Sequence, residues 1–89
     1  METDLTQMVV YCLVMLESAA ADMSILEGTS VAAAQLEGAI ADFSARVEQN
    51  FAPAEATALT AEVEQETAEM PVVDRQEAVI FCVENADSL

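Results

Sequence analysis

Histidine and lysine are both absent from this chain of 89 residues, and the only bases are Arg46 and Arg75. Without histidine there is no imidazole to act as a general base, and most zinc and di-iron sites are excluded. Without a cluster of cations the chain has nothing to meet phosphates. Direct binding to nucleic acid or to an anionic membrane surface is therefore not expected.

Glycine and proline are also scarce, with 2 of each, and residues that favour helices dominate the composition. The longest wholly apolar run, 8–16, is too short for a membrane span, which needs about 20 residues. Glu2 and Asp4 precede this run, whereas a secretory signal carries bases there. The run therefore predicts a buried helix and neither a membrane span nor a signal peptide.

Acid is what the chain has in excess. There are 17 aspartates and glutamates, the net charge is −15, and hydrophobic residues still make up 54 % of the chain. High charge predicts disorder only when hydrophobicity is low, so this composition favours a small folded core. The length suits one domain, which we place over 1–89.

Gly28, Pro53 and Pro71 divide the chain into helical segments. Gly28 suits the residue after a helix, and Pro53 suits the first turn of the next one. The connections are short, which favours antiparallel neighbours. We predict a small antiparallel all-α bundle of about four helices, with the apolar first and last helices packed together. The predicted helices cover 4–27, 30–51, 53–70 and 74–86.

Capping residues suggest where these helices begin. The candidates for the N-cap position are Asp4, Thr29 or Ser30, and Asp74. A strand is the alternative for 79–83, where β-branched and aromatic residues crowd together, but the flanking caps favour a helix.

Two segments indicate where the core lies. Segment 30–51 has the clearest amphipathic pattern, and Gly38 falls on its outer side. The first half of segment 4–27 is apolar around most of its circumference, which predicts a central helix. The apolar positions of 30–51 are Ala32, Leu36, Ala39, Ile40, Phe43, Val47 and Phe51.

Cys12 and Cys82 lie in apolar runs near opposite ends of the chain. They are either two buried, reduced thiols or one disulfide that joins the terminal helices. If the first and last helices are antiparallel neighbours, the two cysteines differ in height along the bundle by only roughly 5 Å, which permits the bond. We expect a cytoplasmic protein, with an exported or periplasmic one as the alternative if the disulfide forms.

No arrangement of residues points to catalysis. Serine and threonine lack a histidine base, and the apolar, cation-poor surroundings of Cys12 and Cys82 keep thiols unreactive. Neither an EF-hand loop nor a glycine-rich phosphate loop is present. The acids of 61–69 are spread along a helix and are too far apart to cage a hard cation. We therefore predict a non-enzymatic protein without a catalytic, cofactor or metal site.

One acidic stripe is a candidate binding surface. Glu55, Glu62, Glu66 and Glu69 fall within about 60° of one another on a helical wheel, and no nearby base neutralises them. A solubilising surface usually mixes bases with acids. The stripe is either such a surface or a docking site for a basic partner.

These features favour an acidic interaction module that docks on a basic protein surface, as an inhibitor or regulator. The partner would be a protein that itself binds nucleic acid, since acids on a helix can imitate phosphates. Small acidic helical proteins that mimic DNA share this charge and size, although the likeness is one of composition alone. The alternatives are an exported, disulfide-closed helical domain and a structural subunit that forms a homodimer through its first and fourth helices.

Overall fold

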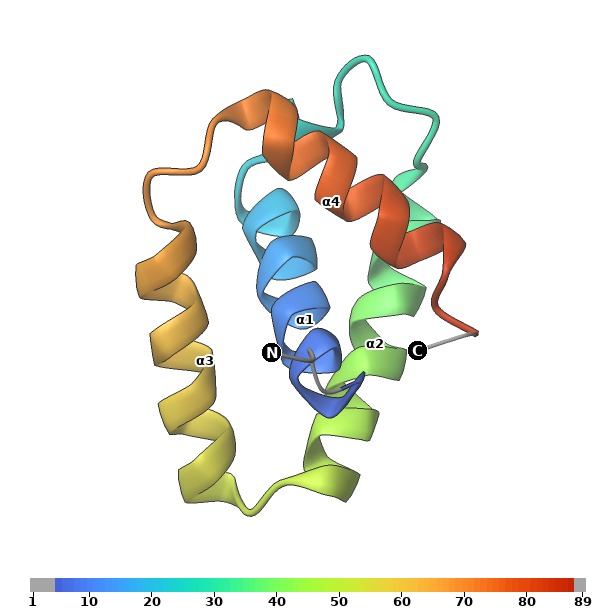
Figure 1. Cartoon of the computed structure of the whole chain (residues 1–89). Helices are drawn as coiled ribbons and strands as arrows, with labels where there is room; N and C mark the ends of the chain where they lie inside the picture. Colours follow the sequence, from blue (N-terminus) through green and yellow to red (C-terminus); the bar gives the residue numbers. More distant parts are fainter. Residues whose placement is uncertain (1–4, 88–89) are drawn as a thin grey trace.

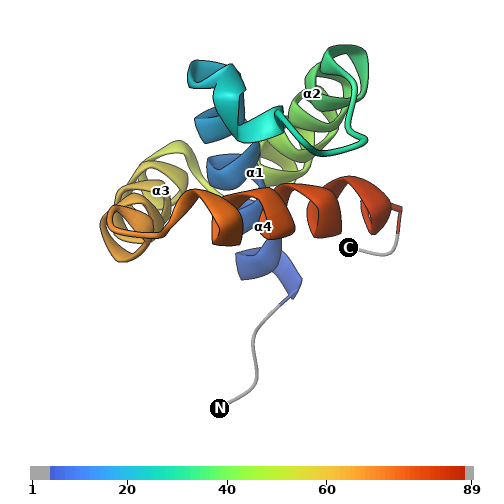
Figure 2. The same cartoon turned by 90° about the horizontal axis from the view of Figure 1, so that it is seen from above.

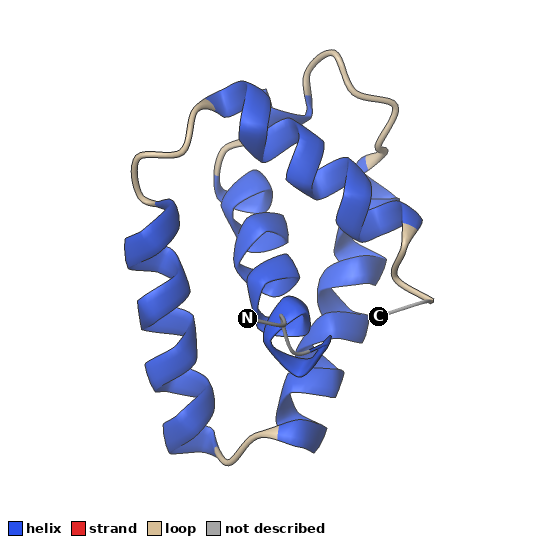
Figure 3. Ribbon diagram, viewed as in Figure 1, coloured by secondary structure: helices blue, strands red, loops and turns tan. Residues whose placement is uncertain are grey.

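The computed structural model describes residues 5–87, and within this range all regular structure is helical (Figure 3). The predicted all-α bundle is confirmed, and its first and last helices pack together. In chain order the elements are α1 (Leu5–Ala21), the short 3-10 helix η1 (Met23–Leu26), α2 (Ala33–Asn50), α3 (Pro53–Thr67) and α4 (Val72–Glu84).

α1 is the centre of the bundle, and the other four elements all pack against it (Figure 1). Viewed from above, α1 lies between α2 and α3, and α4 passes across it (Figure 2). The apolar circumference of α1 therefore faces neighbours in several directions, as the sequence predicted. Its buried residues are Val9, Val10, Cys12, Leu13, Val14, Met15, Leu16 and Ala19.

α2 contributes the second half of the core and packs mainly against α1. Leu36, Ala39, Phe43 and Val47 are buried at the predicted spacing of three and four residues, and Phe43 is fully covered. Gly38 lies on the exposed side of the helix, as expected. None of the helices within 5–87 combines the length and hydropathy that a bilayer span requires.

α4 crosses α1 obliquely in both views, whereas an up-and-down bundle would place it alongside (Figures 1 and 2). Val79 and Cys82 are buried at this crossing. The segment 79–83 is helical, so the strand alternative is excluded.

Cys12 of α1 and Cys82 of α4 form a disulfide, with their Cα atoms 5.6 Å apart. Both residues are fully buried. Of the two alternatives that the sequence left open, the structure contains the bonded pair. The bond joins the central helix to the last turns of the last helix and closes a long loop, because the two residues are 70 positions apart.

The predicted helix 4–27 was too long, because α1 ends at Ala21. Asp22 leaves the helical conformation, and its carboxylate accepts hydrogen bonds from the backbone N–H of Ser24 (3.2 Å) and from the Ser24 hydroxyl (2.6 Å). This local cap starts η1 instead of continuing α1. Asp4, the predicted cap of the first helix, lies outside the described residues.

The prediction that Thr29 or Ser30 caps the second helix was also wrong. The Thr29 hydroxyl donates to the carbonyl of Leu26 at 2.7 Å and so closes the turn after η1. α2 begins only at Ala33, and the side chain of Gln35 accepts a hydrogen bond from the backbone N–H of Ala32 at 2.9 Å.

The other two helix boundaries shift by a few residues. α3 begins at Pro53 as predicted but ends at Thr67, short of the predicted residue 70. α4 begins at Val72, two residues before the predicted start, because Pro71 occupies the N-cap position. Asp74 therefore lies in the first turn of α4, where its charge still favours the helix N-terminus.

The two glycines give opposite predictions for the same substitution. Gly28 has a φ of +83°, so Gly28→Ala should lower the free energy of unfolding by about 1 kcal/mol. Gly38 lies inside α2, and an added Cβ would meet nothing within 4 Å. Gly38→Ala should therefore raise the free energy of unfolding by up to about 1 kcal/mol. Urea unfolding of both variants measures this, and changes of the same sign would contradict the backbone assignment.

Reduction of the Cys12–Cys82 bond should lower the free energy of unfolding by about 4 kcal/mol, because the bond restricts a long loop of the unfolded chain. Urea unfolding with and without reductant measures this difference, and an intact mass lower by two hydrogens before reduction verifies the bond. Identical midpoints for the oxidised and reduced chains would show that the bond contributes nothing to stability.

Candidate functional site

α3 is the least buried of the four helices. Thr67 is its only buried residue, and a thin stripe of Ala56, Leu59 and Val63 is half-buried toward the core. Most of the circumference of α3 is exposed, and all four of its glutamates are exposed residues. Two hollows flank the contact between α3 and α1.

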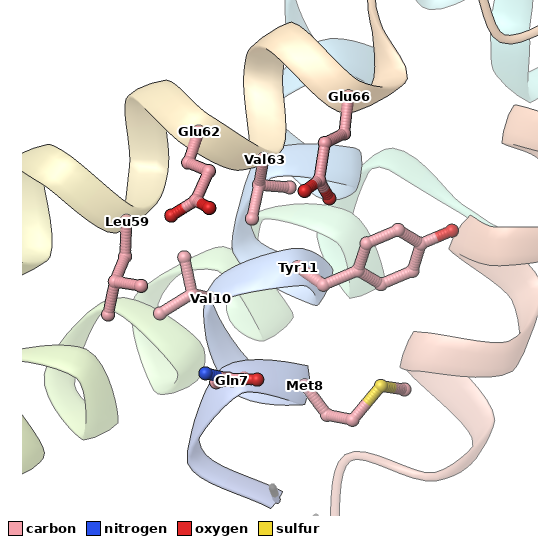
Figure 4. A pocket seen from close by; sticks show the side chains of 8 residues that line it. All are labelled: Gln7, Met8, Val10, Tyr11, Leu59, Glu62, Val63 and Glu66. Carbon is pink, nitrogen blue, oxygen red and sulfur yellow. The ribbon is translucent and has the colours of Figure 1, made fainter. Parts of the chain in front are cut away.

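The first hollow has a volume of about 220 Å³ and lies between the N-terminal half of α1 and the middle of α3. Figure 4 shows the carboxylates of Glu62 and Glu66 extending from α3 toward α1, with the ring of Tyr11 on the α1 side. Apolar side chains form the remaining surface. The described residues that line it are Gln7, Met8, Val10, Tyr11, Leu59, Glu62, Val63 and Glu66.

The second hollow, of about 400 Å³, lies on the other flank of α3. Successive helical residues are about 100° apart, so Glu64, two residues from both Glu62 and Glu66, lies on nearly the opposite side of α3 from them. This hollow is more polar than the first. The described residues that line it are Val14, Glu17, Ser18, Ala21, Thr60, Glu64, Thr67 and Arg75.

Arg75 of α4 ties three helices together at the second hollow. Its Nη2 donates to the backbone carbonyl of Thr67, and its Nε donates to the carbonyl of Met70 at 3.1 Å. Its Nη1 donates to the hydroxyl of Ser18 in α1 at 2.9 Å. The guanidinium therefore adds a donor to the carbonyl of Thr67, the last residue of α3, and to that of Met70 in the connection that follows. The Thr67 carbonyl also accepts a hydrogen bond from the backbone N–H of Met70 at 3.0 Å.

Arg46, the other base, is used within α2. Its guanidinium pairs with Asp42 at 3.1 Å and lies over the ring of Phe43, 5.5 Å from the ring centroid. Asp42 is the only carboxylate within residues 5–87 that has an ion-pair partner. Both arginines are thus engaged inside the molecule, and the other described acids are not neutralised by the chain.

The structure places three of the four glutamates of the predicted stripe on α3 and the fourth just after it. Glu55 lies in the first turn of α3, and its carboxylate accepts a hydrogen bond from the backbone N–H of Ala52 at 3.4 Å. Glu62 and Glu66 meet at the first hollow. Glu69 lies in the turn that follows α3. All four are exposed, and Glu62 and Glu66 share the first hollow.

Sequence reasoning missed Tyr11 and Arg75. Tyr11 was counted as part of an apolar run, although a tyrosine in such a run commonly keeps its hydroxyl near the surface. Arg75 was named only as one of the two bases, and no role was predicted for it. The scarcity of bases was the signal, since one of only two arginines in an acidic chain is expected to have a specific partner.

The arrangement is suited to binding a cation, because two carboxylates border an apolar and aromatic hollow. Within 5–87, no three cysteine, aspartate or glutamate side chains are grouped closely enough to hold a metal ion. Comparison with known proteins gives no significant match to a family model, to a curated protein or to a solved structure.

Replacing the Arg75 guanidinium should destabilise the bundle, because its hydrogen bonds to the carbonyls of Thr67 and Met70 and to the hydroxyl of Ser18 would be lost. Arg75→Met keeps an apolar stem, and we expect it to lower the free energy of unfolding by about 2 kcal/mol. Arg46→Met is the matched control and should cost less than about 1 kcal/mol, since its ion pair is partly exposed. Urea unfolding compares the two variants. Equal losses would contradict a special role for Arg75.

Proposed function

We propose that this protein is a non-enzymatic, acidic interaction module that docks on a basic surface of another protein and so inhibits or regulates it. The observation that carries the proposal is that the chain's own bases do not neutralise most of its described acids. One arginine caps α3 and the other pairs with Asp42, so the remaining described acids face outward without ion-pair partners. A basic partner would supply the missing charge.

α3 is the element best suited to this contact. Its glutamates are exposed, and only a thin stripe of its residues packs against the core, so most of the helix surface is free to contact a partner. Carboxylates on one exposed helix present a row of negative charges, as a nucleic-acid backbone does. The partner class that fits best is a protein whose basic surface binds nucleic acid. Such an acidic surface speeds association and makes it sensitive to salt.

The disulfide supports the exported alternative for location. Buried disulfides persist in oxidising compartments and are rare in the cytosol. Docking on a basic surface depends on charge and shape and is compatible with either compartment. We therefore propose an oxidising compartment as the working environment, in place of the cytoplasmic location that the sequence favoured.

Self-association is the second candidate function, and it rests on exposed apolar residues of α4. Val72, Val73 and Phe81 are 50 %, 62 % and 43 % exposed. The sequence suggested a dimer through the first and fourth helices, but α1 is covered by three helices within one chain. A second copy of the chain would therefore pack against the exposed apolar residues of α4 and not against α1. Native mass at high salt tests this, since a dimer held by apolar contacts persists there.

Reversing the charge of the acidic surface should abolish partner binding. We expect the triple variant Glu62→Lys, Glu66→Lys and Glu69→Lys to lose the proteins that the immobilised native chain captures from an extract of its source cells. Captured proteins should be basic and should dissociate as NaCl rises from about 0.05 M to about 0.5 M, because salt screens exposed charges.

The matched control reverses three exposed acids elsewhere, Glu37, Glu48 and Glu77, and changes the net charge by the same amount. We expect the control to retain most of the captured proteins. Capture that is indifferent to salt, or that survives the Glu62, Glu66 and Glu69 reversal unchanged, would show that these acids only solubilise the chain.

A further inference from the structure

The two hollows beside α3 differ in one respect that suggests a ligand. The second hollow is bordered by Glu17 and Glu64, and the chain places its own cation there, the guanidinium of Arg75. The first hollow is bordered by Glu62 and Glu66, and neither arginine of the chain lines it. Arg46 is engaged on α2 and Arg75 on the opposite flank of α3. The first hollow therefore has the acidic border but lacks a cation.

The lining of the first hollow matches a long side chain that ends in a cation. Val10 is buried and Leu59 and Val63 are half-buried, so the hollow has an apolar base that an aliphatic stem can cover. Tyr11 supplies an aromatic face, which attracts a cation. Glu62 and Glu66 supply carboxylates on the opposite border, as Figure 4 shows.

The size of the hollow favours one side chain over a free small molecule. Its volume of about 220 Å³ is below the roughly 300–1,000 Å³ typical of small-molecule sites. Arginine fits this lining better than lysine. A guanidinium is planar, stacks on aromatic rings and can donate to two carboxylates at once, whereas an ammonium is a compact and strongly hydrated charge.

We propose that the first hollow receives an arginine side chain of the basic partner, with its guanidinium between Tyr11 and the carboxylates of Glu62 and Glu66. This inference rests on the proposed function and narrows it from an acidic surface to a defined pocket. Arginine and tyrosine are common among the few residues that dominate binding energy at protein interfaces. The inserted arginine would fix the register of the partner, and the surrounding acids would contribute long-range attraction.

Three capped tripeptides test the proposal: acetyl-Gly-Xaa-Gly-amide with arginine, lysine or the neutral isostere citrulline at the centre. NMR titration follows the methyl signals of Leu59 and Val63 and the ring signals of Tyr11. We expect saturable shifts that are strongest for the arginine peptide, weaker for lysine and absent for citrulline. The affinity for the arginine peptide should fall about tenfold in the double variant Glu62→Gln and Glu66→Gln, because charge-assisted hydrogen bonds are lost.

The matched control combines Glu37→Gln and Glu48→Gln, two exposed acids of α2, and removes the same charge. Arginine binding that survives in the control and fails in the Glu62/Glu66 variant supports the pocket. Tyr11→Leu should then reduce the preference for arginine over lysine, with the dispersion of the amide spectrum showing that the variant is folded.

Two results would overturn the inference. The first is equal weakening in both double variants, which would show general attraction to the net charge and would leave the proposed function standing. The second is the absence of saturable shifts at Leu59, Val63 and Tyr11 with the arginine peptide. In that case the charge-reversal capture experiment decides the proposed function separately, since it depends on the acidic surface and not on this hollow.

Discussion

The burial of α1 on most of its circumference is the constraint on which the rest of the structure depends. A helix that is apolar in several directions needs neighbours in each of them, and α2, α3, α4 and η1 supply these. Burial of each large side chain, such as Met15 or Leu16, contributes about 1.5–3 kcal/mol. Because α1 takes the centre, the other helices contact α1 more than one another. The Cys12–Cys82 bond holds α4 across it.

The placement of charge follows from this arrangement. The core accommodates no carboxylate, so the acids of the described chain lie on the outside or at the edges of the hollows. The two arginines are both engaged within the chain. Arg75 donates to the backbone carbonyl at the end of α3, and Arg46 pairs with Asp42 within α2. The helix with the narrowest attachment, α3, consequently carries acids that nothing in the chain neutralises. The proposed docking surface therefore has two physical bases: α3 buries little of its surface in the core, and its carboxylates have no ion-pair partners within the described chain.

The sequence predicted the helices and the core because periodicity reports burial directly, as at Leu36, Phe43 and Val47. It predicted helix ends poorly, because a local hydrogen bond such as that of Asp22 to Ser24 competes with helix continuation. The helical wheel grouped Glu62 with Glu66 correctly. It missed the hollow beside them, because that hollow needs Tyr11 from α1, and the packing of two distant segments is not encoded in either one alone.

Residue-resolved hydrogen exchange of the native chain tests most directly whether α1 is the stable centre and α3 its lightly held cover. Exchange reports the free energy of local opening at each amide. Our account predicts the slowest exchange at the centre of α1 and at the facing residues of α2, and distinctly faster exchange along α3. Amides of α3 that exchange as slowly as those of α1 would contradict it, because α3 would then be an integral part of the core.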